Sequence, residues 1–202
     1  MIPKQKSPIV AGFGVESIEY HLGGMFRGSY YTLNDNIING RIRGIGGVVG
    51  CNNARSQHNN ECITIIKELI KNDVIVFTTG CNAIACATHG LLTPETAGVF
   101  CGPGLAEVCE TVGMPPVLGI GSCVDNSRIL LAATEVVKAG GLGKDLCDIP
   151  AAGSAPEWMS EKAISIGHYF VSSGVYTVFG LHLPTSGAPV FHEYLSKEME
   201  KL

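Results

Sequence analysis

The sequence lacks the features that mark exported, membrane-spanning and nucleic-acid-binding proteins. No stretch approaches the roughly 18 consecutive apolar residues of a membrane span, and residues 1–6 contain no apolar core of signal-peptide length. The chain has 14 basic and 18 acidic residues, a net charge of −4 and no long basic run. This charge gives no electrostatic basis for binding nucleic acid or an anionic membrane. We therefore expect a cytoplasmic protein.

Two common metal and cofactor motifs are also missing. No two cysteines have the Cys-x-x-Cys spacing of a zinc ribbon, and neither a GxGxxG segment after a strand nor a P-loop occurs. Cysteine and glycine are abundant instead, with eight and 26 copies among 202 residues. In a reducing compartment stable disulfides are not expected, so each cysteine is either a small buried apolar residue or a metal or redox group.

Short apolar runs alternate with helical patterns, and no linker divides the chain, so one domain spanning residues 1–202 is predicted. We expect strands, each apolar on both faces, at Ile45–Gly50, Val74–Gly80, Val117–Ser122 and Tyr176–Leu181. We expect helices at Asn60–Lys71, Leu105–Val112, Ser127–Ala139, Ser154–Ser173 and Phe191–Lys201. Asp125 would cap the third helix, and Ser154 and Glu157 have capping-box spacing for the fourth, after a loop at Gly140–Gly153. The prediction is a Rossmann-like, three-layer α/β domain with a mostly parallel sheet and helices on both faces.

Three of the predicted strands end in the same way, with a small residue, a cysteine and then polar residues. The cysteines are Cys51, Cys81 and Cys123. Ligands of an open parallel sheet bind at the carboxyl ends of its strands, so the three thiols would meet at one edge. The start of a following helix would favour the thiolate, which binds metal, and the small residue would let the backbone approach a bulky inorganic group. A tight turn with a buried thiol explains one instance, but three in register predict convergent metal or redox chemistry.

The other five cysteines have weaker signals. Cys62 and Cys109 lie on apolar faces of predicted helices and are interpreted as core residues. Cys86 follows Cys81 by about a turn and a half of helix, so it is either core or a neighbour of the ligands. Cys101 and Cys147 lie in predicted loops, and nothing marks either of them as a ligand.

Lys162 shares a helical stripe with Trp158, Ile166 and Tyr169. Such a lysine either extends its ammonium into water or, held in a polar pocket, donates a proton or stabilises bound negative charge. Spacing alone leaves both interpretations open. Among the histidines, His89 is expected at the edge of the same crevice and His168 is a candidate neighbour of the site, whereas the others are interpreted as structural or surface residues.

At these residues the chain resembles the nickel-dependent carbon monoxide dehydrogenases, and most closely the catalytic subunit of the carbon monoxide dehydrogenase/acetyl-CoA synthase type. The resemblance covers nearly the whole chain and is strongest in five stretches: Asn34–Gly44, Gly47–Asn53, Thr79–Ala83, Gly121–Arg128 and Ala155–Ala163. It implies an anaerobic enzyme of the Wood–Ljungdahl pathway that reversibly oxidises carbon monoxide with water to carbon dioxide, two protons and two electrons. The implied partners are a second copy in a homodimer, ferredoxin and acetyl-CoA synthase.

The resemblance also implies a cofactor and a role for each candidate residue. The cofactor is a nickel–iron–sulfur cluster of the Ni-4Fe-4S type. Cys51 and Cys81 correspond to cysteines that bind iron, and Cys123 to the cysteine that binds nickel. Lys162 corresponds to a lysine that stabilises the bound carboxylate and assists proton transfer, and Ile166 to an apolar residue over the nickel.

Complete members of that family are implied to be much longer than this chain. Their amino-terminal part carries further iron–sulfur clusters, and a middle part supplies a histidine and more cysteines to the active cluster. We therefore expect this chain to be the carboxyl-terminal cluster-binding domain, to bind little or no intact cluster alone, and to have no activity without its missing part. One alternative is a stand-alone, non-catalytic module that holds a simpler iron–sulfur or zinc centre or acts in assembly. A weaker alternative is a small-ligand binder without metal.

Overall fold

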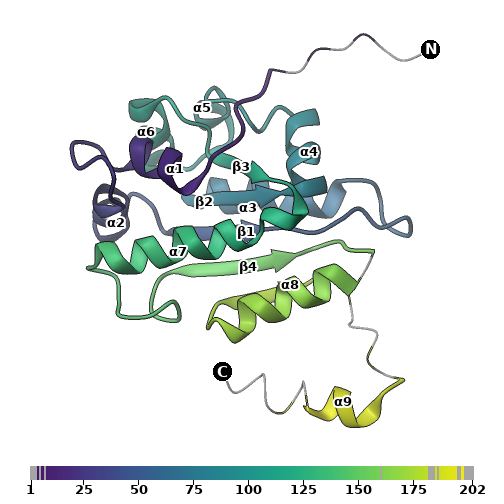
Figure 1. Cartoon of the computed structure of the whole chain (residues 1–202). Helices are drawn as coiled ribbons and strands as arrows, with labels where there is room; N and C mark the ends of the chain where they lie inside the picture. Colours follow the sequence, from purple (N-terminus) through teal and green to yellow (C-terminus); the bar gives the residue numbers. More distant parts are fainter. Residues whose placement is uncertain are drawn as a thin grey trace.

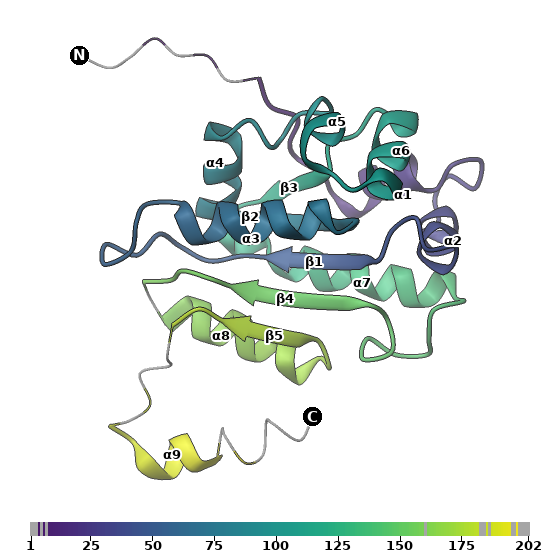
Figure 2. The same cartoon turned by 180° about the vertical axis from the view of Figure 1, so that it is seen from behind.

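The structure, a computed structural model, describes residues 4, 6, 8–159, 161–181, 185, 187–194 and 197, and only the backbone of 161–163. Within this part, a sheet of five parallel strands lies between two layers of helices (Figures 1 and 2). The strands are β1 Gly44–Val48, β2 Val74–Thr79, β3 Val117–Gly121, β4 Ala151–Ala155 and β5 Tyr176–Phe179, in the spatial order β3-β2-β1-β4-β5. The predicted three-layer α/β fold is confirmed.

The helices cover both faces of the sheet. On one face lie α1 Val15–Leu22, α2 Tyr31–Ile38, α7 Ser127–Ala139 and α8 Glu161–Ser172; the first two pack on α7 (Figure 1). On the other lie α3 Asn60–Lys71, α4 Gly80–Thr88, α5 Thr96–Phe100 and α6 Pro103–Val112, where α4 and α5 pack on α3 (Figure 2). A short 3-10 turn, η1 Cys123–Asp125, precedes α7. Within the described residues, none of the helices has both the length and the apolar character needed to cross a membrane.

The order of the strands places a topological switch point between β1 and β4. From β1 the chain first builds β2 and β3 on one side, then crosses to build β4 and β5 on the other. In open α/β sheets a ligand binds outside the carboxyl ends of the strands, in the crevice where the loops diverge to opposite faces. The loop from β1 to α3 and the loop from β4 to α8 flank this point, because α3 and α8 lie on opposite faces (Figures 1 and 2).

The predicted helix from Ser154 to Ser173 is wrong at its start. Its first residues belong to β4, which begins within the predicted loop and pairs with β1 and β5, while α8 begins at Glu161. The segment Ala151–Ala155 has no β-branched or aromatic residue, so its strand conformation comes from pairing on both sides. Asp125 is also not the cap of α7: its carboxylate accepts hydrogen bonds from Ser122 in a capping box around η1.

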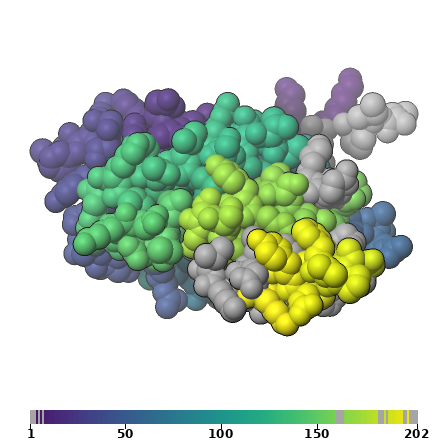
Figure 3. Space-filling model, turned by 60° about the horizontal axis from the view of Figure 1, so that its bottom comes forward, coloured from purple at the N-terminus to yellow at the C-terminus, as the bar shows by residue number. Residues whose placement is uncertain are grey.

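The strand β5 and the helix α9 (Pro189–Tyr194) form an exposed end of the molecule (Figure 3). The expectation that β5 is apolar and covered on both faces is wrong, since Tyr176 is 73% exposed and Val178 47%. A groove of about 280 Å³ separates α3 from β4 and β5 and is lined by Asn60, Glu61, Thr64, Ile65, Ser154, Pro156, Val178 and Gly180. Much of the predicted helix Phe191–Lys201 lies outside the described residues.

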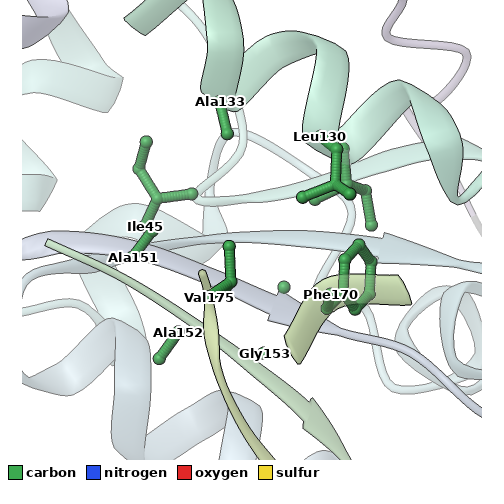
Figure 4. A pocket seen from close by; sticks show the side chains of 10 residues that line it. Ile45, Leu130, Ala133, Ala151, Ala152, Gly153, Phe170 and Val175 are labelled. Atoms are coloured by element: carbon green, nitrogen blue, oxygen red, sulfur yellow. The ribbon is translucent and has the colours of Figure 1, made fainter. Parts of the chain in front are cut away.

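A small apolar cavity lies between the sheet and the helices α7 and α8 (Figure 4). It measures about 20 Å³ and is lined by Ile45, Gly47, Ile129, Leu130, Ala133, Ala151, Ala152, Gly153, Phe170 and Val175. Several of these residues have little or no side chain, because β1 and β4 are rich in glycine and alanine. The strands therefore leave space where larger residues would fill the core.

Candidate metal-binding edge of the sheet

The three predicted cysteines follow three neighbouring strands. Cys51 comes three residues after the end of β1, Cys81 lies in the first turn of α4 directly after β2, and Cys123 is the first residue of η1 after β3. Because β1, β2 and β3 are adjacent and parallel, their carboxyl ends share one edge of the sheet. Cys81 is exposed, and Cys51 and Cys123 are partly exposed.

The spacing of the strands indicates what kind of metal group this edge can hold. Neighbouring strands lie about 4.8 Å apart, so the ends of β1 and β3 are roughly 10 Å apart. The ligands of a single zinc ion all lie about 2.3 Å from the metal. Within the described residues, no three His, Cys, Asp or Glu side chains are placed to share a single metal ion. Three thiols spread along one edge suit a larger group with several metals, and thiolates are ligands that iron–sulfur clusters prefer.

The turns that carry Cys81 and Cys123 pack directly against each other. A Cβ atom added to Gly80 would lie 3.1 Å from Cys123 Cβ and 3.2 Å from Cys123 N. The hydroxyl of Thr79, at the end of β2, donates a 2.5 Å hydrogen bond to Asn126 Oδ1, and Asn126 Nδ2 donates to the carbonyl oxygen of Cys123 at 2.8 Å. Thr79 and Asn126 are both buried, so this network is shielded from water. It fastens the Cys123 turn to the end of β2.

The Cys123 turn is also held from within. The N–H and O–H groups of Ser122 donate to Asp125 Oδ2 at 2.8 and 3.0 Å, and Arg128 lies 3.2 Å from the same carboxylate. The hydrogen bond from the backbone N–H of Ser122, followed by that from its hydroxyl, lowers the pKa of Asp125 below its usual value. Asp125 is therefore ionised at neutral pH and fixes η1.

The Cys51 loop is bound to the loop between β4 and α8. The N–H of Cys51 donates to the carbonyl oxygen of Glu157 at 2.8 Å, and the N–H of Asn53 donates to Glu157 Oε2 at 3.1 Å. Asn53 Nδ2 donates to the carbonyl oxygen of Trp158 at 3.1 Å. The helix α3 begins at Asn60, as predicted, nine positions after Cys51, so Cys51 does not lie in the first turn of a helix as Cys81 does. Hydrogen bonds to Glu157 and Trp158 hold the loop that precedes α3.

The small residues before two of the cysteines let neighbouring loops pack together, and their predicted role beside an inorganic group stays a prediction. Gly50 has a φ of +135°, and a Cβ there would overlap the carbonyl oxygen of Glu157. Gly80 has a φ of +57° and leaves room for the backbone of Cys123. Both glycines therefore allow neighbouring loops of the protein to approach each other, in a conformation that disfavours other residues.

The remaining thiols behave as core residues. Three of them are buried: Cys62, Cys86 and Cys109. This confirms the prediction for Cys62 and Cys109, and of the two alternatives for Cys86 it supports a core residue. A hydrogen bond with Cys86 and burial raise the pKa of Cys62 far above its usual value, so it stays a thiol. Burial raises the pKa of Cys109 to about 12 and that of Cys101, which is partly exposed, also to about 12. Cys147 is exposed, away from the three strand ends.

Lys162 lies in the first turn of α8, which follows β4 at the same edge of the sheet, but its side chain lies outside the described part of the structure. Its role stays a prediction. The predicted stripe is wrong at Trp158, which precedes α8 and is buried. Ile166, one turn after Lys162, is partly buried against the main core.

The histidines contribute less to this edge than expected. His89 follows the last residue of α4, and eight residues of helix separate it from Cys81 by about 12 Å. Its ring nitrogen Nδ1 lies 2.9 Å from the carbonyl oxygen of Ala85. His168 lies in α8 with its ring 6.2 Å from that of Phe179, and burial lowers its pKa.

Sequence reasoning missed Glu157 and Asn126. Glu157 has no exposed surface, although its spacing from Ser154 resembles a capping box. Five buried polar atoms in the segments after β1, β2 and β4 have no hydrogen-bond partner within the described residues: Asn52 Oδ1, Asn82 Nδ2, Asn82 Oδ1, Glu157 Oε1 and Trp158 Nε1. These residues follow Cys51, Cys81 and β4, so several buried polar groups gather at the carboxyl edge of the sheet. The polar residues after each cysteine were the only signal in the sequence.

Comparison with known proteins identifies the family. The model of the Prismane/CO dehydrogenase family matches residues 3–202. The chain belongs to this family. A relative from Methanosarcina mazei, carbon monoxide dehydrogenase 1, is 53% identical over 201 residues, which are 100% of this chain and 31% of that protein. The family resemblance expected from the sequence is confirmed.

Two solved structures of the family share the fold. A nickel-free carbon monoxide dehydrogenase from Thermococcus sp. AM4 is 48% identical with a TM-score of 0.89, and the match covers 100% of this chain and 31% of that one. An acetyl-CoA synthase/carbon monoxide dehydrogenase described with NiZn[Fe4S4] and NiNi[Fe4S4] clusters is 35% identical with a TM-score of 0.86, over 95% of this chain and 30% of that one. The chain thus spans about a third of the length of the relatives it matches.

Proposed function

We propose that this chain is the carboxyl-terminal, cluster-binding part of a nickel–iron–sulfur carbon monoxide dehydrogenase. The observation that carries the proposal is the position of Cys51, Cys81 and Cys123 after three adjacent parallel strands in a chain of this family. Cys51 and Cys81 would bind iron and Cys123 nickel. When bound, the cluster supplies the site at which carbon monoxide and water react and takes up the two electrons.

Residues of the chain itself would hold this group and transfer a proton to or from it. The network of Thr79 and Asn126 keeps Cys123 beside Cys81, and the hydrogen bond to Glu157 fixes the backbone of Cys51. Lys162, in the first turn of α8 at the same edge, would stabilise negative charge that develops at the site and donate or accept a proton. Ile166, one turn later, would contribute an apolar contact over the nickel.

Three cysteines are too few ligands for a cluster with several metals. The proposed partner is therefore the remaining two thirds of the enzyme, which would supply the other ligands and the electron relay. A homodimer, ferredoxin and acetyl-CoA synthase are the further partners that we propose. On this view the isolated chain has no carbon monoxide oxidation activity and binds little or no intact cluster.

The test uses anaerobically purified chain, alone and combined with the remaining part of the enzyme. Nickel and iron content, the visible spectrum, and reduction of methyl viologen by carbon monoxide would be measured in both states. We expect metal and activity only in the combination. Metal and activity in the isolated chain would contradict its incompleteness, and a metal-free, inert combination would contradict the enzyme assignment.

Single substitutions then test each ligand in the combined protein. Cys51→Ser and Cys81→Ser should lower the iron content, and Cys123→Ser should lower the nickel content. Cys147→Ser is the matched control, because Cys147 is exposed but lies away from the strand ends. A retained iron or zinc centre without nickel in the isolated chain would instead favour a stand-alone, non-catalytic module.

A further inference from the structure

We propose that Glu157 is a positioning residue that joins the Cys51 loop to the segment leading into α8, and so sets Cys51 for cluster binding. The inference rests on the proposed function of this edge. Glu157 lies shortly before Lys162 in the sequence. Through Glu157, the loop that carries one ligand and the helix that carries the lysine are held as one unit.

The first observation is where Glu157 lies in the fold. The loops after β1 and β4 flank the switch point of the sheet and lead to helices on opposite faces, so their usual tendency is to diverge. Here the main-chain carbonyl of Glu157 accepts from Cys51, its carboxylate accepts from Asn53, and the next carbonyl, of Trp158, accepts from the Asn53 side chain. Three hydrogen bonds therefore cross the switch point beside Cys51.

The second observation is the burial of the carboxylate. Glu157 has no exposed surface, and none of the ion pairs among the described side chains includes it. Burying a carboxyl group without a charged partner is unfavourable. A glutamate that followed β4 without any further role would therefore be expected at the surface. The main-chain bond from Cys51 alone would not require glutamate. The contact that does require the side chain is the one with the N–H of Asn53.

The third observation is the fit of the Cys51 loop to this residue. Gly50 permits the carbonyl oxygen of Glu157 to lie where a Cβ would otherwise be, and the side chain of Asn82, next to Cys81, lies close to the same glycine. Asn82 is fully buried. Glu157 thus contacts the loop of one predicted iron ligand, and Asn82, from the helix that carries the other, lies against the same glycine.

Two variants and one control separate positioning from simple stability. Glu157→Ala removes the acceptor for Asn53, whereas Glu157→Gln keeps an oxygen in its place and is the conservative variant. Asn34→Ala is the control: Asn34 is 1% exposed and donates to the carbonyl oxygens of Val136 and Gly140, both at 2.8 Å. Those bonds tie α2 to the end of α7 that lies away from the cysteine edge (Figure 1).

The first measurement is hydrogen exchange of the peptide that contains residues 50–54, in the isolated chain. We expect about tenfold faster exchange in Glu157→Ala, a factor that corresponds to about 1.4 kcal/mol, and no change in Glu157→Gln or Asn34→Ala. The second measurement is iron content and the electron paramagnetic resonance spectrum of the chain combined with the remaining part of the enzyme. Glu157→Ala should lose iron and alter the spectrum, Glu157→Gln should restore both, and Asn34→Ala should change only the thermal stability.

Each other result counts against a defined part of the inference. Unchanged exchange in Glu157→Ala would show that the carboxylate does not hold the loop. Faster exchange with unchanged iron and spectrum would show a structural bond without influence on the cluster. If the wild-type combination itself binds no cluster, the proposed function fails and the positioning role fails with it, while the exchange data still decide whether Glu157 holds the Cys51 loop.

Discussion

Replacing Gly80 with alanine tests how tightly the Cys81 turn packs on the Cys123 turn. Gly80 has a φ of +57°, a left-handed conformation that costs other residues about 1–2 kcal/mol. The new Cβ would lie 3.1 Å from Cys123 Cβ, closer than the roughly 3.5–4.0 Å of an ordinary carbon–carbon contact. Forcing an extra methyl group into a packed site typically costs about 1–3 kcal/mol more. We therefore expect Gly80→Ala to lower the free energy of unfolding by about 2–5 kcal/mol.

Gly90→Ala is the matched control for this experiment. Gly90 has a φ of +70°, but a Cβ there would meet no atom within 4 Å, so only the conformational cost of about 1–2 kcal/mol applies. Guanidinium denaturation of the two variants, at equal m-value, gives the difference directly. Equal destabilisation would refute the close packing of Gly80 on Cys123. In the combined protein, Gly80→Ala but not Gly90→Ala should also lower the nickel content, because it displaces Cys123.

Two further predictions concern stability. Gly47→Ala should raise the free energy of unfolding by up to about 1 kcal/mol, since its Cβ would lie 3.5 Å from Ile129, at the apolar cavity of Figure 4, and alanine restricts the unfolded chain. Gly44→Ala, whose Cβ would overlap a backbone carbonyl oxygen, should instead lower the thermal midpoint; the same direction for both variants would contradict the packing of β1. The lowered pKa of Asp125 means that its bonds with Ser122 stabilise the fold above the usual carboxyl pKa and are lost as the pH falls through the lowered value. The stability difference between wild type and Asp125→Asn, measured by urea denaturation, should therefore be largest near neutral pH and vanish in acid; a constant difference would argue against ionisation as the cause.

Local pattern predicted much of the fold. The helices Asn60–Lys71 and Ser127–Ala139 have the predicted ends, because their apolar periodicity and stop signals lie within the segments themselves. The strand β2 was predicted from its run of valine, isoleucine and phenylalanine. In contrast, β4 consists of alanine, glycine and serine, and only its two neighbours in the sheet make it a strand. No window of the sequence contains that information.

The sequence likewise predicted one part of the candidate site and not another. The strand-end cysteines could be assigned to one edge, because parallel strands share the direction of their carboxyl ends. The role of Glu157 could not, since its partner Asn53 lies 104 positions away and the capping-box spacing pointed to a different structure. The roles of Lys162 and Ile166 come from the family resemblance alone, so they stay predictions.

The open edge at β5 has a practical consequence for work on the isolated chain. In the described part of the sheet, β5 has a neighbour on one side only, and Tyr176 and Val178 are exposed along it. Such an edge is a template on which a strand from another molecule can add, and it carries no lysine or proline between Tyr176 and Phe179 to prevent this. Oligomers formed by the isolated chain at high concentration would then reflect strand addition at β5 and reveal nothing about the native assembly. The variant Val178→Lys would distinguish strand addition at β5 from native assembly, because a lysine at this position would abolish only the oligomers that form through the edge.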